Sequence, residues 1–160
     1  MLSVSVICIG KLKERFFEQA CAEYQKRLSR FCALNIKELS ECALPENPSG
    51  AQIDAALKKE GEMIEREIPS GAYTISLCVE GKQLSSNELS EKLDGVALSG
   101  KAKVCFIIGS SFGLAQSVKQ KSNLCLSFSK MTFPHQLFRV LLLEQIYRAF
   151  SISNGMKYHK

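Results

Sequence analysis

Apolar residues in this chain fall into short continuous runs, separated by longer segments in which they recur at helical spacing. The short runs predict five strands, over residues 2–9, 34–39, 73–79, 104–108 and 124–128. The longer segments predict helices over residues 14–31, 51–67, 86–93, 115–121 and from about 132–135 to 154. Strands that alternate with helices indicate an α/β fold, a parallel sheet with helices on both faces. We expect one domain over residues 1–160.

The run 104–108 lacks charged residues, which predicts a strand buried on both faces at the centre of the sheet. In parallel sheets, ligands bind beyond the carboxyl ends of the strands. Three loops meet that description: the loop after Leu77, the loop 109–113 and the segment 128–134. A ligand site is therefore expected where these loops meet. The connection 40–50, with two prolines, is long and is expected to be mobile.

Charge is unevenly distributed. Residues 101–160 contain nine Lys and Arg against one acid, whereas residues 1–100 contain twelve against fifteen. A basic region of this kind favours a polyanionic partner, RNA or DNA. A surface tuned for solubility would have the same composition, and charge alone leaves both interpretations open.

Composition is that of a globular protein, with 46% hydrophobic and 23% charged residues. No apolar run approaches the roughly 20 residues of a membrane helix, and residues 2–9 lack the features of a signal peptide. We therefore expect a cytoplasmic protein without a membrane partner. Seven cysteines without a C-x-x-C pair lie mostly in apolar runs, which favours buried thiols over disulfides or a metal site.

Candidate chemistry concentrates in the last thirty residues. Arg148 is a cation able to grip a phosphate, but Glu144 stands one helical turn before it and is its natural ion-pair partner. A basic tail after the helix carries Tyr158 and His159, and such tails fray unless something orders them. His135 could cap the helix, contact a ligand or be structural. The loop 109–113 lets a ligand approach the backbone, yet it would serve equally as a plain turn.

Several of these segments together resemble one family. They are Ile107-Ile108-Gly109, Phe133-Pro134-His135, Arg139-Val140, Glu144-Gln145-Ile146-Tyr147-Arg148-Ala149 and the ending Tyr158-His159. The chain resembles the ribosomal RNA large subunit methyltransferase H family, of the SPOUT class of S-adenosylmethionine-dependent methyltransferases, over its whole length. The resemblance implies a C-terminal deep trefoil knot and a homodimer. It also implies methyl transfer from S-adenosyl-L-methionine to N3 of a pseudouridine in 23S rRNA on the ribosome, without a metal.

The resemblance further implies a set of site residues. The expected cofactor-binding residues are Leu77, Gly109, Ser110, Phe128, Ser129, Lys130, Met131, Thr132, Phe133 and Pro134. The expected catalytic residues are Arg148, Tyr158 and His159, with His159 as the proton acceptor and the tail completing the partner's site. Ser110 departs from the Gly-Gly pair that the family often has, and a positive φ there would be strained.

Two other functions remain open from the residues. The first is a non-catalytic RNA- or ribosome-binding factor of the same fold. The second is a flavodoxin-like nucleotide-binding enzyme, with a phosphate site at residues 109–113.

Overall fold

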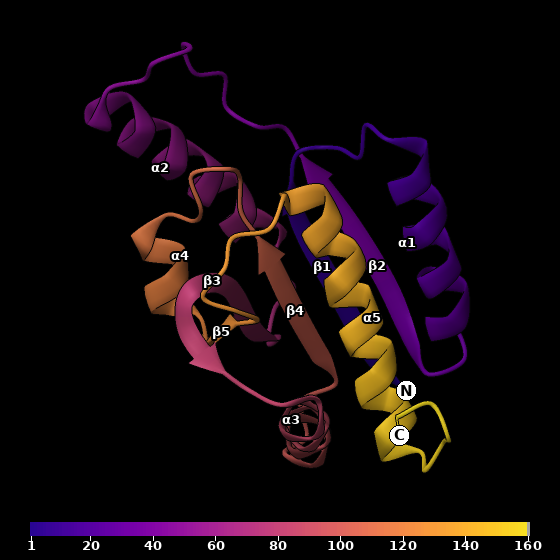
Figure 1. Ribbon diagram of the computed structural model, residues 1–160. Coiled ribbons are helices and arrows are strands. Elements are labelled where there is room, and N and C mark those ends of the chain that lie inside the picture. Colours follow the sequence, from indigo (N-terminus) through magenta and orange to yellow (C-terminus); the bar gives the residue numbers. More distant parts are fainter. Residues whose placement is uncertain (160) are drawn as a thin grey trace.

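The computed structural model describes residues 1–159, in which five strands alternate with five helices (Figure 1). The strands are β1 (Leu2–Ile9), β2 (Cys32–Leu39), β3 (Tyr73–Gln83), β4 (Lys103–Ile108) and β5 (Leu124–Ser127). The helices are α1 (Arg15–Leu28), α2 (Gly50–Glu67), α3 (Ser86–Leu98), α4 (Gln116–Lys121) and α5 (His135–Ser153). The predicted alternation is thereby confirmed. No helix within the described residues has the length and apolar character needed to cross a membrane.

All five strands pair in parallel, in the order β2-β1-β4-β3-β5. β4 is the middle strand, and Val104 to Ile108 are all buried, as the uncharged run predicted. The order differs from the 2-1-3-4-5 arrangement of flavodoxin-like proteins, because β3 and β4 exchange places. The flavodoxin-like interpretation is therefore wrong at the level of topology.

The two faces of the sheet pack against different helices. On β4, Phe106 faces the larger core, which α1, α3 and α5 cover, whereas Ile107 faces the smaller core formed with α2 and α4. β1 alternates in the same way, with Val6 on one face and Ile7 on the other. Because the side chains of β1 and β4 alternate between two buried faces, both strands consist mainly of apolar residues.

Helix α5 runs the length of the sheet and begins at the carboxyl ends of the strands (Figure 1). Its first turns are attached there by the buried Arg139. Arg139 Nη1 donates to Glu38 Oε2 of β2 at 2.6 Å, and Nη2 donates to the carbonyl oxygen of Gly10 at 3.1 Å. Nearby, the Lys13 backbone N–H donates to Gln136 Oε1. The start of α5 is thus fixed to the ends of β1 and β2.

Two predicted boundaries were wrong by four residues or more, while α1 ends at Leu28 rather than 31 and β2 begins at Cys32 rather than 34. β3 continues to Gln83 rather than 79, and pairs with β5 a second time, at Lys82 and Gln83, after a shift in register. Gly81 permits this close approach, because a Cβ there would lie 2.7 Å from the Cys125 carbonyl. Helix α3 extends to Leu98 rather than 93, and the chain turns after it at Gly100, which has a φ of +84°.

We expect Glu38→Ala to lower the free energy of unfolding by about 3 kcal/mol, because it leaves the buried Arg139 guanidinium without its carboxylate. The matched control is Glu67→Ala, which breaks the exposed Lys37–Glu67 pair and should cost under about 1 kcal/mol. Urea denaturation measures both. Equal costs would contradict the anchoring role of Arg139.

Candidate functional site

A cavity of about 640 Å³ lies at the carboxyl ends of β4 and β5, beside the middle of β3. Leu77 and Cys78 line it from β3, residues 108–114 from the loop after β4, and residues 126–129 from the end of β5. The segment 131–135 and Phe138 of α5 close the remaining side. The loop 109–113 and, except for Lys130, the segment 128–134 line one cavity, as expected. The loop expected after Leu77 was wrong, because β3 continues to Gln83 and this wall of the cavity is a strand.

The turn after β4 is closed by its own backbone. Gly113 N–H donates to the Ser110 carbonyl at 2.9 Å, and Gly113 has a φ of +90°. A Cβ on Gly109 would lie 2.2 Å from the Gly113 carbonyl oxygen, so any larger residue must open the turn. Ser110 does not have a positive φ, and its side chain donates to Glu60 Oε1 at 2.9 Å. The strain expected from Ser110 is therefore absent from this turn.

Of the ten predicted cofactor-binding residues, nine line this cavity; Lys130 is not among the lining residues. Cys78, Phe112 and Phe138 also line the cavity, although they were not among the expected cofactor-binding residues. For His135 the sequence left three roles open. His135 is the first residue of α5, and its side chain lines the cavity. The N-cap position of α5 is Pro134, and no side chain caps the helix there. Among residues 1–159, no group of three or more His, Cys, Asp or Glu side chains is arranged to hold a metal ion.

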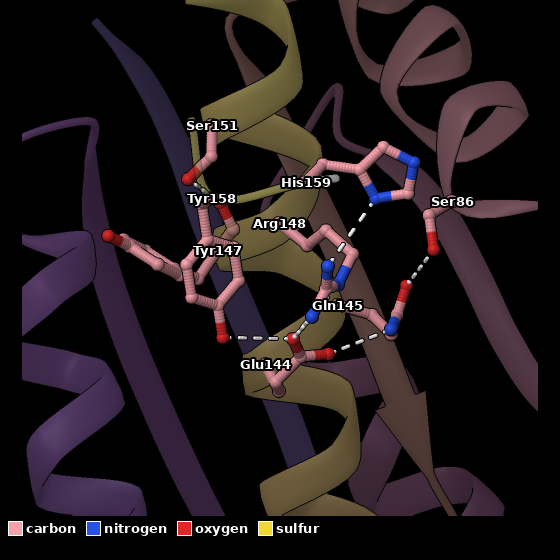
Figure 2. A network of polar contacts seen from close by, with 8 residues as sticks. All are labelled: Ser86, Glu144, Gln145, Tyr147, Arg148, Ser151, Tyr158 and His159. Carbon is pink, nitrogen blue, oxygen red and sulfur yellow. Dashed lines mark hydrogen bonds and ion pairs between the residues drawn. The ribbon is translucent and has the colours of Figure 1, made fainter. Parts of the chain in front are cut away.

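The predicted catalytic residues gather around Glu144, in the middle of α5 (Figure 2). Glu144 Oε1 accepts from Arg148 Nε at 3.0 Å, from Arg148 Nη2 at 2.6 Å and from the Tyr158 hydroxyl at 3.1 Å. Gln145 Nε2 donates to Glu144 Oε2 at 2.7 Å, while Ser86 Oγ donates to Gln145 Oε1. The expected Glu144–Arg148 pair is confirmed, as part of a larger network.

The tail is ordered by this network. Tyr158 is half-buried, its ring packs edge-on against Tyr147 at 4.8 Å, and the Arg148 guanidinium lies 4.6 Å from the same ring. Burial, with contacts to Tyr24 and Glu144, raises the pKa of Tyr158 to about 12. Tyr158 is therefore a hydrogen-bond donor at neutral pH and not a base. The fraying expected of a basic tail does not occur at this residue.

His159 Nδ1 lies 3.4 Å from Arg148 Nη1. A guanidinium only donates hydrogen bonds, so Nδ1 is the acceptor in this contact. The His159 side chain is exposed, unlike that of Tyr158. The contact joins the last described residue to α5.

The cavity and the Glu144 network are neighbours along α5. Phe138 lines the cavity and Arg148 belongs to the network, and the ten residue steps from one to the other rise roughly 15 Å along the helix. Glu144 lines, with Gln145, a smaller pocket that shares Leu126, Phe128 and Phe133 with the cavity. Arg148, Tyr158 and His159 do not line the cavity, so the predicted residues form two adjoining groups, one at the first turn of α5 and one at its middle and the tail.

Four of the basic residues in the C-terminal part are paired with acids. Lys119 pairs with Glu80, Lys121 with Glu65, Arg139 with Glu38 and Arg148 with Glu144. Three of these acids belong to residues 1–100, so the imbalance along the sequence is partly compensated in space. The charge count overstated the local positive field.

The cysteines are free thiols in the structure. Cys8, Cys21, Cys32 and Cys105 are buried, as their apolar surroundings predicted, and burial raises the pKa of the Cys105 thiol to about 12. Cys42, Cys78 and Cys125 are only partly buried.

Comparison with known proteins identifies the class. A family model described as "Predicted SPOUT methyltransferase" matches residues 2–159. A solved structure of a probable methylase family protein from Haemophilus influenzae superposes with a TM-score of 0.55, at 15% identity, covering 100% of this chain and 72% of that one. This second likeness concerns the fold alone. The protein, a parallel sheet with a loop-lined cavity at its carboxyl edge, is thus a methyltransferase of the SPOUT class.

Relatives of similar length define the family more narrowly. Proteins named ribosomal RNA large subunit methyltransferase H are 51% identical in Clostridium botulinum, 48% in Leuconostoc mesenteroides and 49% in Bacillus cytotoxicus. Each match covers 159 residues, 99% of this chain and 100% of the relative. The chain belongs to the ribosomal RNA large subunit methyltransferase H family of SPOUT methyltransferases.

The raised pKa of Tyr158 predicts a loss of stability at high pH. Between about pH 10 and about pH 12 an unfolded tyrosine ionises while folded Tyr158 keeps its proton, so stability falls as the pH rises through this window. We expect the wild-type free energy of unfolding to decrease more steeply over this range than that of Tyr158→Phe, which lacks the ionising group. Urea denaturation at several pH values measures this, and parallel curves would contradict it.

Proposed function

We propose that this protein transfers a methyl group from S-adenosyl-L-methionine to N3 of a pseudouridine in 23S rRNA, acting on the ribosome. The family supports a methyltransferase, and the names of the relatives support large-subunit rRNA as the substrate. The single observation that carries the proposal is that the loop 109–113, the segment 128–134 and the middle of β3 enclose one cavity. A non-catalytic RNA-binding factor would have no use for this cavity.

The cavity fits the methyl donor in size and chemistry. Its volume of about 640 Å³ lies within the range of roughly 300–1,000 Å³ that small-molecule sites occupy. Apolar side chains such as Leu77, Leu126 and Phe138 form much of the wall, while the turn at Gly109 brings backbone polar groups to its edge. The donor would be held by the nine expected cofactor-binding residues that line the cavity.

The proposal includes the trefoil knot of the family. β5 is the edge strand next to β3, yet α5 begins beside Gly10 at the end of β1. The segment 128–134 must therefore cross the ends of β3 and β4, and it lines the cavity together with the loop 109–113. We propose that this crossing passes through the chain loop after β4 and forms the knot.

When bound, the donor supplies an electrophilic methyl group on a sulfonium. The remaining requirements are alignment, exclusion of water and removal of the N3 proton as the N–C bond forms and the S–C bond breaks. We assign the proton to His159 Nδ1, which carries the lone pair of the ring; accepting the proton requires the contact with Arg148 Nη1 to open. Arg148 and the Tyr158 hydroxyl are donors, suited to holding phosphate or base oxygens of the RNA.

A homodimer would unite the two groups of residues. Within one chain, Arg148 lies roughly 15 Å along α5 from Phe138 of the cavity wall, and Arg148, Tyr158 and His159 do not line the cavity. A two-fold axis that pairs α5 with its copy can bring the network of one chain to the cavity of the other. We therefore propose that each active site combines the cavity of one chain with Arg148, Tyr158 and His159 of its partner.

We expect Gly109→Ala to abolish measurable binding of S-adenosylmethionine, because the new Cβ would lie 2.2 Å from the Gly113 carbonyl and must open the turn. Isothermal titration calorimetry measures the affinity. The control is Gly95→Ala in α3, where the new Cβ meets no atom within 4 Å and binding should stay at the wild-type value. A wild-type chain without binding heat would favour the non-catalytic alternative.

A complementation experiment tests the composite site. We expect Gly109→Ala and His159→Ala chains each to be inactive in methyl transfer to ribosomes. Unfolded and refolded together in equal amounts, they should recover about a quarter of the wild-type activity, because half of the dimers then contain one intact site. A chain ending at Met156 should behave as His159→Ala does. Full activity of His159→Ala and of the shortened chain would remove the tail from the mechanism, and absence of recovery would contradict the shared site.

A further inference from the structure

Glu60 is a buried carboxylate outside the proposed donor cavity. It lies on α2, on the opposite face of the sheet from α5, and is 3% exposed. No ion pair to it is found among residues 1–159. Burying a carboxylate costs free energy unless hydrogen bonds compensate for the lost water. Glu60 accepts two hydrogen bonds, and these define its role.

The first hydrogen bond fixes the turn that lines the cavity. Ser110 Oγ donates to Glu60 Oε1 at 2.9 Å, and Ser110 is itself 9% exposed. On its inner side this turn is closed by the bond from Gly113 N–H to the Ser110 carbonyl. Glu60 therefore holds from outside a turn whose shape limits the cavity.

The second hydrogen bond fixes a different segment. The Cys42 N–H donates to Glu60 Oε2 at 3.0 Å, which ties the connection between β2 and α2 to the same carboxylate. This connection, residues 40–49, is the segment that the sequence predicts to be mobile. One carboxylate thus joins the turn at Ser110 to a long loop outside the cavity.

We propose that Glu60 is a positioning residue that holds the donor-binding turn through Ser110 and couples it to the loop 40–49 through Cys42. The inference rests on the proposed function, since the ligand of the turn is the methyl donor. It also explains the departure of Ser110 from the paired glycines of the family: the hydroxyl provides the attachment that Glu60 uses.

The test compares Glu60→Gln, Ser110→Ala and the double variant, with S-adenosylmethionine as the ligand in calorimetry. Hydrogen bonds to charged groups are the stronger ones, so we expect each single variant to bind about tenfold more weakly. The double variant should bind no more weakly than either single one, because each change already removes the same hydrogen bond from the Ser110 hydroxyl to a charged carboxylate. Glu62→Gln, an exposed acid on the same helix, is the matched control and should keep the wild-type affinity.

A second measurement separates positioning from a general loss of stability. We expect S-adenosylmethionine to slow hydrogen exchange at the Cys42 amide in the wild-type chain, and to lose this effect in Ser110→Ala, whose Glu60–Cys42 bond remains. This variant removes only a hydroxyl, so it decides the matter even where Glu60→Gln does not fold.

The outcomes are distinguishable. Wild-type affinity in folded Glu60→Gln or in Ser110→Ala overturns the positioning role, as does a Cys42 amide that responds equally in wild type and Ser110→Ala. A wild-type chain that does not bind S-adenosylmethionine overturns the proposed function, and this inference with it.

Discussion

The attachment of α5 to the sheet through Arg139 is the constraint on which the remaining structure depends. A buried guanidinium is stable only with its hydrogen bonds and its counter-charge, and Glu38 and the Gly10 carbonyl provide them at the carboxyl ends of β2 and β1. The helix must therefore begin there. As a result Pro134, His135 and Phe138 stand beside the middle of β3 and the segments that follow β4 and β5, and together these enclose the cavity.

The same attachment determines where the other end of α5 lies. A straight helix of nineteen residues that begins at the carboxyl edge of the sheet ends near the opposite edge. Arg148 and the tail thus lie outside the cavity, while Glu144, in the middle of the helix, lines a smaller pocket next to it. The order of the tail has a local cause, because Tyr158 packs on Tyr147 and donates to Glu144. A rigid tail at a fixed distance suits a site made by two chains.

The cavity itself depends on close approaches of the backbone. Gly81 lets β3 return to β5, and Gly109 lets the chain after β4 turn within contact distance of Gly113. Ser110 occupies its position without a positive φ and gives its hydroxyl to a buried acid of α2. The turn is therefore held both by its own backbone and by the helix layer on the opposite face from α5.

Much of the fold was already determined by the sequence, because apolar runs and helical spacing record directly which residues meet the core. The uncharged run 104–108 predicted the central strand, and the one-turn spacing of Glu144 and Arg148 predicted their ion pair. The loop 109–113 and the segment 128–134 around the cavity followed from the rule for parallel sheets, whereas the third wall is part of β3 and not the predicted loop. The lengths of β3 and α3 could not be predicted from the sequence, because the ends of these elements depend on the close approach at Gly81 and the turn at Gly100.

Only the tertiary structure decided the partners of the buried charges. Glu60 follows two lysines in a charged segment and resembles a solvated helix position, yet it is buried beside Ser110, fifty residues later. Arg139 and Glu38 are 101 residues apart. Only the structure separated the cavity from the Arg148 group, which the sequence presents within one thirty-residue segment. Pairing across such distances has no periodicity in sequence, because it arises from the crossing of elements in space rather than from the face that each element buries.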